Sequence, residues 1–334
     1  MNDLTEKQMA GQRLMAGFTG TAFNDELRYA IDTLKVGGLI LFSRNIEAPE
    51  QIQSLCAEAQ AYARQSGQPP LLIAIDQEGG VVARLKAPFT QFAGNPAMRS
   101  REDAQRFAEI TARELSQIGV NMNMAPVLDV PPPQGPSVMI QRAFGRAPQW
   151  VADMGATVIE HLQANGIMAV GKHFPGIGRT VLDSHEDLPD LEIDADSLAD
   201  RDLIPFEAAL DADVSGIMLS HIRYTGLDPI WPASLSPAVA HELLRRQMGY
   251  EGLVLTDDLD MGAIAKHYQL PAIVTQCLAA TVDILLICHS GSKLRSAHDE
   301  IIRQTQSDPA LQIQGQESVT RILAAKERFV TLNS

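Results

Sequence analysis

The chain has 334 residues, of which 45% are hydrophobic, so it can bury a large core, and its length falls within the range of a single α/β barrel. The formal net charge of −14 would repel nucleic acid and anionic membrane surfaces at long range, which argues against both as the main partner. No segment is apolar and long enough to span a bilayer.

The N-terminus and the cysteines indicate the compartment. Residues 1–7 include acidic side chains where a signal peptide would have a basic start and an apolar run. Cys56, Cys277 and Cys288 are an odd number, and none of them forms a Cys-x-x-Cys pair. This pattern is typical of reduced thiols and not of a disulfide framework. We therefore expect a soluble, cytoplasmic protein.

Apolar runs typical of buried strands recur along the whole chain. The eight runs are Leu14–Phe18, Gly38–Phe42, Leu71–Ile75, Val120–Leu128, Gly166–Val170, Gly216–Leu219, Gly252–Leu255 and Ile284–Cys288. Most are separated by stretches with helical character, among them Pro49–Gln65, Arg101–Ile118, Pro148–Asn165 and Pro237–Met248. Continuous apolar strands that alternate with helices indicate a parallel sheet covered on both faces. Eight such units favour a closed (β/α)8 barrel over a doubly wound sheet.

The domain organisation follows from the absence of linkers. No stretch rich in Gly, Ser or charge divides the chain, and the Pro-rich segment Ala125–Pro136 is interpreted as a long loop, so we expect one domain over residues 1–334. Val319, Ile322 and Leu323 lie on one face of a predicted helix, Ser318–Phe329, which we expect to pack on the outside with a structural role. Met122, Met124 and Met218 are interpreted as barrel filling.

Polar side chains follow the predicted strands, which is where a (β/α)8 barrel carries its functional groups. They are Asp76-Gln77-Glu78 after the third run, Asp129 and Gln141-Arg142 after the fourth, Lys172-His173 after the fifth, Ser220-His221 after the sixth, Thr256-Asp257-Asp258 after the seventh and His289 after the eighth. We expect this ring of groups to converge at the carboxyl-terminal face.

The stretch from Gly171 to His185 is the most informative segment. Pro175, Gly176 and Gly178 cannot continue a strand, so a mobile loop is expected after Lys172 and His173. On this loop Asp183 lies two residues before His185, a spacing at which the carboxylate can orient the imidazole as a general acid/base.

The chemistry of these groups favours glycoside cleavage. The chain lacks a Gly-rich phosphate fingerprint and paired metal-ligand motifs, so we expect neither a cofactor nor a metal, although convergence of His173, His221 and Asp257 would leave a metal-dependent barrel hydrolase open. In glycoside cleavage, a carboxylate at a strand end attacks the anomeric carbon, and a second group protonates the leaving oxygen and then activates water. His185 could fill this second role.

These motifs together resemble the family 3 glycoside hydrolases. The resemblance rests on Lys172–Gly176, Thr180 and Asp183–His185, on Asp76–Gly80 upstream and on Thr256–Leu259 downstream, and it covers nearly the whole chain. It implies a (β/α)8 barrel and a retaining mechanism with a covalent glycosyl-enzyme intermediate. It also implies that Asp257 is the nucleophile and that His185 with Asp183 forms the acid/base dyad. The positions that match the family's sugar-binding residues are Asp76, Arg84, Arg142, Lys172 and His173.

Within the family, the chain is most similar to single-domain bacterial β-N-acetylhexosaminidases of peptidoglycan recycling. The resemblance implies a carbohydrate substrate, a muropeptide that contains N-acetylglucosamine. Two-domain members often take the acid/base from a second domain, for which this chain has no room, so the loop dyad would be needed. A β-glucosidase or a phosphorylase of the same family remains an alternative. Ile177 and Arg179 depart from the family loop, and they leave a non-catalytic sugar-binding barrel as a further alternative.

Overall fold

A closed barrel of parallel strands forms the centre of the molecule. The computed structural model describes residues 4–289 and 291–330, and within them eight strands close in the order β1-β12-β11-β9-β7-β6-β3-β2. The strands are β1 (Leu14–Ala16), β2 (Gly38–Leu41), β3 (Leu72–Ile75), β6 (Met122–Asn123), β7 (Met168–Phe174), β9 (Gly216–Leu219), β11 (Leu253–Asp258) and β12 (Ile284–Ile287). Each lies within or overlaps one predicted apolar run, and the (β/α)8 prediction is confirmed.

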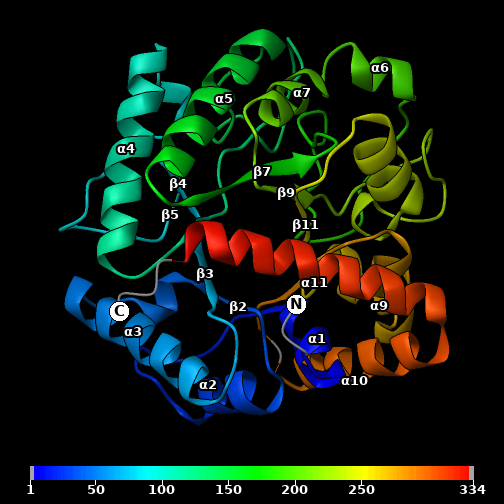
Figure 1. The fold of residues 1–334 in the computed structure, drawn as a ribbon. Helices are drawn as coiled ribbons and strands as arrows, with labels where there is room; N and C mark the ends of the chain where they lie inside the picture. The colour runs from blue at the N-terminus through cyan, green and yellow to red at the C-terminus, as the bar shows by residue number, and fades with distance from the viewer. Residues whose placement is uncertain (1–3, 290, 331–334) are drawn as a thin grey trace.

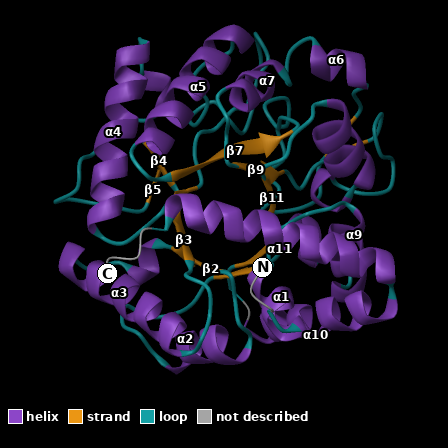
Figure 2. Ribbon diagram, viewed as in Figure 1, coloured by secondary structure: helices purple, strands orange, loops and turns teal. Residues whose placement is uncertain are grey.

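The helices surround this barrel, as Figures 1 and 2 show. They are α1 (Glu6–Gln12), α2 (Asp25–Arg28), α3 (Pro49–Gln65), α4 (Arg101–Gln117), α5 (Pro148–Ala164), α6 (Ala195–Ala199), α7 (Ile204–Asp211), α8 (Gly262–Ala265), α9 (Leu270–Ala279), α10 (Gly291–Ser307) and α11 (Pro309–Phe329). Local sequence fixes their starts: Pro occupies the first turn of α3 and α5, and Ser100 caps α4 by accepting the N–H of Asp103 at 3.3 Å. The predicted helix Pro237–Met248 is a segment with π-helical turns, Ala238–Gln247.

The barrel interior is a separate apolar cluster. Alternate strand residues point inward and fill it, including Met122, Met124 and Met218, which confirms their predicted packing role. Ile322 and Phe329 of α11 belong to the same cluster. The long helix α11 therefore does more than pack on the outside: it closes the amino-terminal end of the barrel, and Figure 1 shows it lying across the ring.

Two barrel strands differ in length from their predictions. The fourth run was predicted to extend to Leu128, but β6 ends at Asn123; beyond it, the carbonyls of Ala125 and Pro126 accept the N–H groups of Val170 and Lys172. The pairing with β7 resumes as a bridge from Val127 to Lys172. In contrast, β7 continues to Phe174, so Lys172 and His173 lie within the last part of a buried strand. This strand holds their backbone rigidly.

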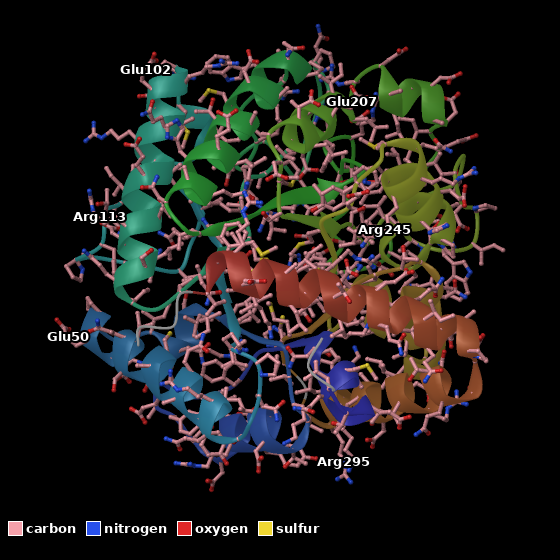
Figure 3. The ribbon with its side chains drawn as sticks, in the orientation of Figure 1. Glu50, Glu102, Arg113, Glu207, Arg245 and Arg295 are labelled. Atoms are coloured by element: carbon pink, nitrogen blue, oxygen red, sulfur yellow. The ribbon has the colours of Figure 1, made fainter. Side chains whose placement is uncertain are left out.

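Short strands and charged surfaces complete the fold. The pair β4 (Gln77–Gly79) and β5 (Val82–Ala83) follows β3, and β8 (Asp190–Leu191) pairs with β10 (Arg223–Tyr224). Figure 3 shows Glu50, Glu102, Arg113 and Arg295 on the outer faces of the surrounding helices. None of the helices described combines the length and the apolar character needed to cross a membrane. Residues 1–3, which contribute to the N-terminal interpretation, lie outside the described residues.

Candidate active site

The carboxyl-terminal ends of the barrel strands open into a cavity of about 360 Å³. All eight predicted site residues line it: Asp76, Arg84, Arg142, Lys172, His173, Asp183, His185 and Asp257. Lys172 and His173 lie in β7 and Asp257 in β11, and the others lie in the segments that follow strands. The convergence inferred from the strand ends is therefore present in the structure. A larger cavity of about 520 Å³ lies near the opposite end, between α11 and the starts of β9 and β11, and none of these residues lines it.

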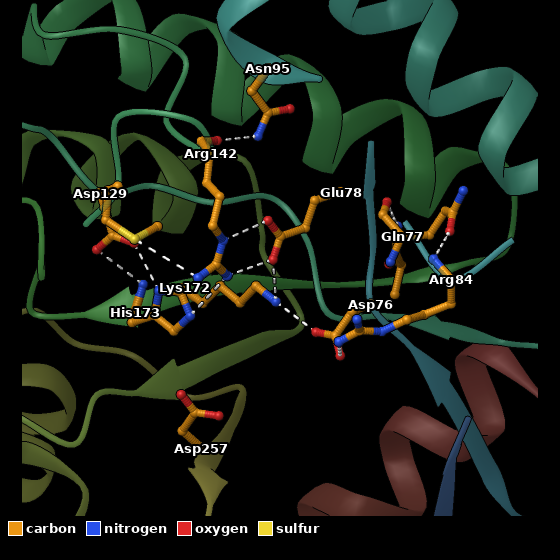
Figure 4. A network of polar contacts seen from close by, with 12 residues as sticks. Asp76, Gln77, Glu78, Arg84, Asn95, Asp129, Arg142, Lys172, His173 and Asp257 are labelled. Carbon is orange, nitrogen blue, oxygen red and sulfur yellow. Dashed lines mark hydrogen bonds and ion pairs between the residues drawn. The ribbon is translucent and has the colours of Figure 1, made fainter. Parts of the chain in front are cut away.

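One wall of the cavity is an alternating network of cations and carboxylates (Figure 4). Lys172 Nζ lies 2.7 Å from Asp76 Oδ1 and 2.7 Å from Glu78 Oε1. Arg142 donates to both carboxylate oxygens of Glu78, at 3.0 and 2.7 Å, and Arg84 donates to Asp76 Oδ2 at 3.0 Å. Two carboxylates are thus held by three cations, a paired geometry that fixes each side chain.

The network keeps its members ionised. Burial alone would raise the pKa of Asp76, but Lys172 and Arg84 outweigh it and hold this pKa well below its usual range. Glu78 follows the same pattern, with Lys172 and Arg142 as the opposing charges. Burial would lower the pKa of Lys172, but the charges of Asp76 and Glu78 raise it above its ordinary value. The wall therefore presents fixed charges to a polar ligand.

His173 is oriented by Asp129. The ring Nδ1 lies 2.8 Å from Asp129 Oδ2, and Asp129 Oδ1 accepts the backbone N–H of Ile177 at 2.7 Å and, at 3.3 Å, that of His173. Nδ1 donates to the carboxylate, and Nε2 lies 3.5 Å from Arg142 Nη2. Asp129 thus fixes both the imidazole and the start of the following loop.

Asp257 stands in the last part of β11, on the floor of the cavity. Its Oδ1 accepts the backbone N–H of Asp258 at 2.8 Å. Burial would raise the pKa of its carboxyl, but His221 and His173 lead the opposing interactions and lower it below its ordinary value. Asp257 does not cap the next helix, because α8 begins after Met261. A half-buried, ionised carboxylate that lines the cavity is suited to nucleophilic attack.

Asp183 and His185 lie across the cavity on the loop of residues 175–189, which we call the dyad loop. His185 Nδ1 lies 2.7 Å from Asp183 Oδ1, and the same oxygen accepts the backbone N–H of His185 at 2.9 Å. Burial would raise the pKa of Asp183, but these hydrogen bonds lower it. Both side chains are more than half exposed, at 54% and 69%, so the imidazole is accessible to a bound ligand.

Comparison with known proteins identifies the family. Residues 4–325 match the model of the glycosyl hydrolase family 3 N-terminal domain. The chain belongs to glycosyl hydrolase family 3. The β-hexosaminidase of Alkalilimnicola ehrlichii is 38% identical over 286 residues, which cover 83% of this chain and 80% of that protein. β-Hexosaminidase A of Pseudoalteromonas piscicida is 35% identical over 320 residues, 85% of this chain.

Two solved structures share the whole fold. A family 3 β-N-acetylglucosaminidase from Paenibacillus superposes with a TM-score of 0.93 at 37% identity and covers 99% of this chain. A β-N-acetylhexosaminidase from Beutenbergia cavernae gives a TM-score of 0.89 at 28% identity, over 98% of this chain and 100% of its own. The present chain spans 65% of the Paenibacillus chain and 54% of the P. piscicida protein.

The two departures from the family loop have different surroundings. Ile177 is buried and lines the cavity. Arg179 does not line it: its Nε pairs with Asp202 Oδ2 at 2.8 Å, on the turn before α7. Burial raises the pKa of Asp202 to about 6 even though Arg179 opposes this shift. Ile177 therefore changes the cavity wall. Arg179 instead links the first part of the dyad loop to the turn before α7.

The sequence did not reveal the roles of Glu78 and Asp129. Both follow strands in polar segments, which was the available signal, but their partners Arg142 and His173 lie far away in the chain.

His221 supports the floor of the cavity: its Nε2 donates to the carbonyl of Asp258 at 3.0 Å, and its Nδ1 accepts from Ser234. Asp258 accepts the N–H groups of Asp260 and Cys288. Within residues 4–289 and 291–330, no group of three or more His, Cys, Asp or Glu has an arrangement that could hold a metal ion.

Proposed function

We propose that this protein is a retaining exo-β-N-acetylglucosaminidase that removes terminal N-acetylglucosamine from muropeptides derived from peptidoglycan. The observation that carries this proposal is that Asp257 and the Asp183–His185 pair line the same cavity, beside a wall of fixed charges. The relatives named β-hexosaminidases support the sugar, and the resemblance of the loop motif to peptidoglycan-recycling enzymes supports the muropeptide.

In the first step, an Asp257 oxygen attacks the anomeric carbon, and the bond from this carbon to the leaving oxygen breaks. The electron pair stays on the leaving oxygen, which takes the proton from His185 Nε2. The product of this step is a covalent ester between the sugar and Asp257. Asp183, bonded to Nδ1, orients the imidazole and stabilises its charged form.

In the second step, His185 Nε2 takes a proton from water, and the water oxygen attacks the anomeric carbon. The ester bond breaks, and Asp257 leaves with its electron pair, so that two displacements retain the configuration. Asp76, Arg84, Arg142, Lys172 and His173 are assigned to the sugar hydroxyls. Their mutual ion pairs hold them in place before the sugar binds, which reduces the ordering required on binding.

The reacting groups all come from this barrel, and we propose that residues 1–334 act as one catalytic domain. We also propose a cytoplasmic location. This rests on Cys56, Cys277 and Cys288, all of which are buried free thiols, as in proteins of a reducing compartment.

The proposal is tested with a panel of aryl β-glycosides that differ at the 2-position of the sugar. We expect cleavage of the N-acetylglucosaminide, little cleavage of the glucoside, and loss of activity in Asp257→Ala. A fluorinated substrate analogue should label Asp257, and a label on any other residue contradicts its assignment as nucleophile. Products formed with and without inorganic phosphate separate a hydrolase from a phosphorylase. Cleavage rates measured separately on muropeptides and on chito-oligosaccharides decide the natural substrate class.

A further inference from the structure

The dyad loop rests on the segment that follows the proposed nucleophile. Ala263 donates its backbone N–H to the carbonyl of Ser184 at 3.0 Å, and Gly262 donates to that of His185 at 3.3 Å. These two carbonyls flank the imidazole along the chain. The backbone that carries His185 is therefore bonded to α8, which begins five residues after Asp257.

Two side chains of the same segment extend this contact. Lys266 Nζ donates to the carbonyl of Glu186 at 2.5 Å, and His267 Nε2 lies 2.5 Å from Asp187 Oδ1. The hydrogen bond with His267 lowers the pKa of Asp187 below its ordinary value. The 262–267 segment thus contacts four successive residues of the loop, from Ser184 to Asp187.

Gly262 allows this close approach. A Cβ atom at position 262 would lie 2.6 Å from the carbonyl oxygen of His185 and 2.7 Å from that of Glu186. Both distances are shorter than any ordinary contact of a Cβ atom, and both partners are backbone atoms, so any side chain at this position forces the loop away from α8.

The exposure of the dyad makes this support important. The His185 side chain is 69% exposed and so has little packing of its own to fix it. Its position over the cavity depends on the loop backbone and on the hydrogen bond from Asp183. Displacements of about 1 Å of a catalytic group can lower a rate about 10²-fold.

We propose that Gly262, Lys266 and His267 are positioning residues, which dock the dyad loop so that His185 faces the sugar bound at Asp257. The proposal rests on the proposed function, because it assumes that His185 is the acid/base. None of the three residues is assigned a contact with the sugar.

The test uses Gly262→Ala and an N-acetyl-β-glucosaminide with a 2,4-dinitrophenyl leaving group. This leaving group departs without protonation, so attack by Asp257 should persist and release about one dinitrophenolate per active site in a rapid burst. The second step needs a base, so steady-state turnover should fall about 10²-fold. Azide needs no base: it forms a bond to the anomeric carbon as the Asp257 ester bond breaks, and it should restore turnover and yield a β-glycosyl azide.

Gly291→Ala is the matched control, because a Cβ at position 291 would meet no atom within 4 Å. It should behave as the wild-type enzyme, without acceleration by azide. Wild-type turnover in Gly262→Ala overturns the proposal, and so does the joint loss of burst and turnover in a folded variant. If Gly262→Ala does not fold, the Lys266→Ala/His267→Ala double variant is judged by the same readouts. A wild-type enzyme that cleaves no N-acetylglucosaminide refutes the proposed function instead.

Discussion

The ammonium group of Lys172 lies 2.7 Å from Oε1 of Glu78, a carboxylate whose side chain is only 1% exposed. Glu78 also accepts two hydrogen bonds from Arg142, from Nε and Nη2. It is therefore a deeply buried anion of the site, and it holds together two cations assigned to the sugar.

Glu78→Gln should destabilise the protein and weaken substrate binding. The change leaves Arg142 without its carboxylate and Lys172 with Asp76 alone, and a broken buried pair costs about 3–5 kcal/mol. Urea unfolding should show this loss, and KM should rise because both cations lose their fixed positions. Glu50→Gln, on the exposed face of α3 (Figure 3), is the control and should change the free energy of unfolding by less than about 0.5 kcal/mol. Equal effects of the two changes would contradict the role given to Glu78.

The same network predicts a loss of stability in acid. The pKa values of Asp76 and Glu78 are lowered in the folded protein, so below about pH 4.3 the unfolded chain binds more protons than the folded one. The stabilisation is fully present above that pH, and it falls as the pH drops towards the folded-state values. Urea titrations from pH 6 to pH 3 should show this slope, and Glu78→Gln should show a shallower one. Parallel curves would exclude Glu78 as a source of the slope.

His185→Ala should lower kcat by about 10²–10⁴ for substrates with poor leaving groups, because these need a proton in the first step. The loss in the first step should shrink as the leaving group becomes more acidic. Asp183→Asn keeps the imidazole but weakens its orientation, so its effect should be smaller and of the same kind. Rates measured over a series of aryl leaving groups give the result. A loss independent of the leaving group would show that His185 is not the acid.

Lys326→Met should stabilise the protein at neutral pH. Lys326 is buried in α11, its Nζ donates to Gln12 Oε1, and burial lowers its pKa to about 7. Because the unfolded chain holds this proton up to about pH 10.4, wild-type stability should rise between pH 7 and pH 10. The variant should lose that slope, and its free energy of unfolding at pH 7 should rise by on the order of 2–4 kcal/mol. Lys7→Met, at an exposed position of α1, is the control. A variant with the wild-type slope would contradict the buried charge.

The barrel and the members of the site could be predicted because parallel strands carry their functional groups at one end. Lys172, His173 and Asp257 follow apolar runs, and that order alone places them at a common face. The bonds between them could not be predicted. Glu78 reaches Arg142 from the short strand β4, and Asp129 reaches His173 beside the bridge that joins Val127 to Lys172 of β7. The docking of the dyad loop on α8 could not be predicted either, because it depends on the backbone conformations of both segments.

The position of α11 has a consequence for the route by which a substrate reaches the site. Ile322 and Phe329 seal the far end and methionines fill the lumen, so the cavity at the carboxyl-terminal ends of the strands has no continuation along the barrel axis. Under the proposed function, the sugar therefore binds and leaves at the carboxyl-terminal face, because the filled barrel axis offers no route for a product.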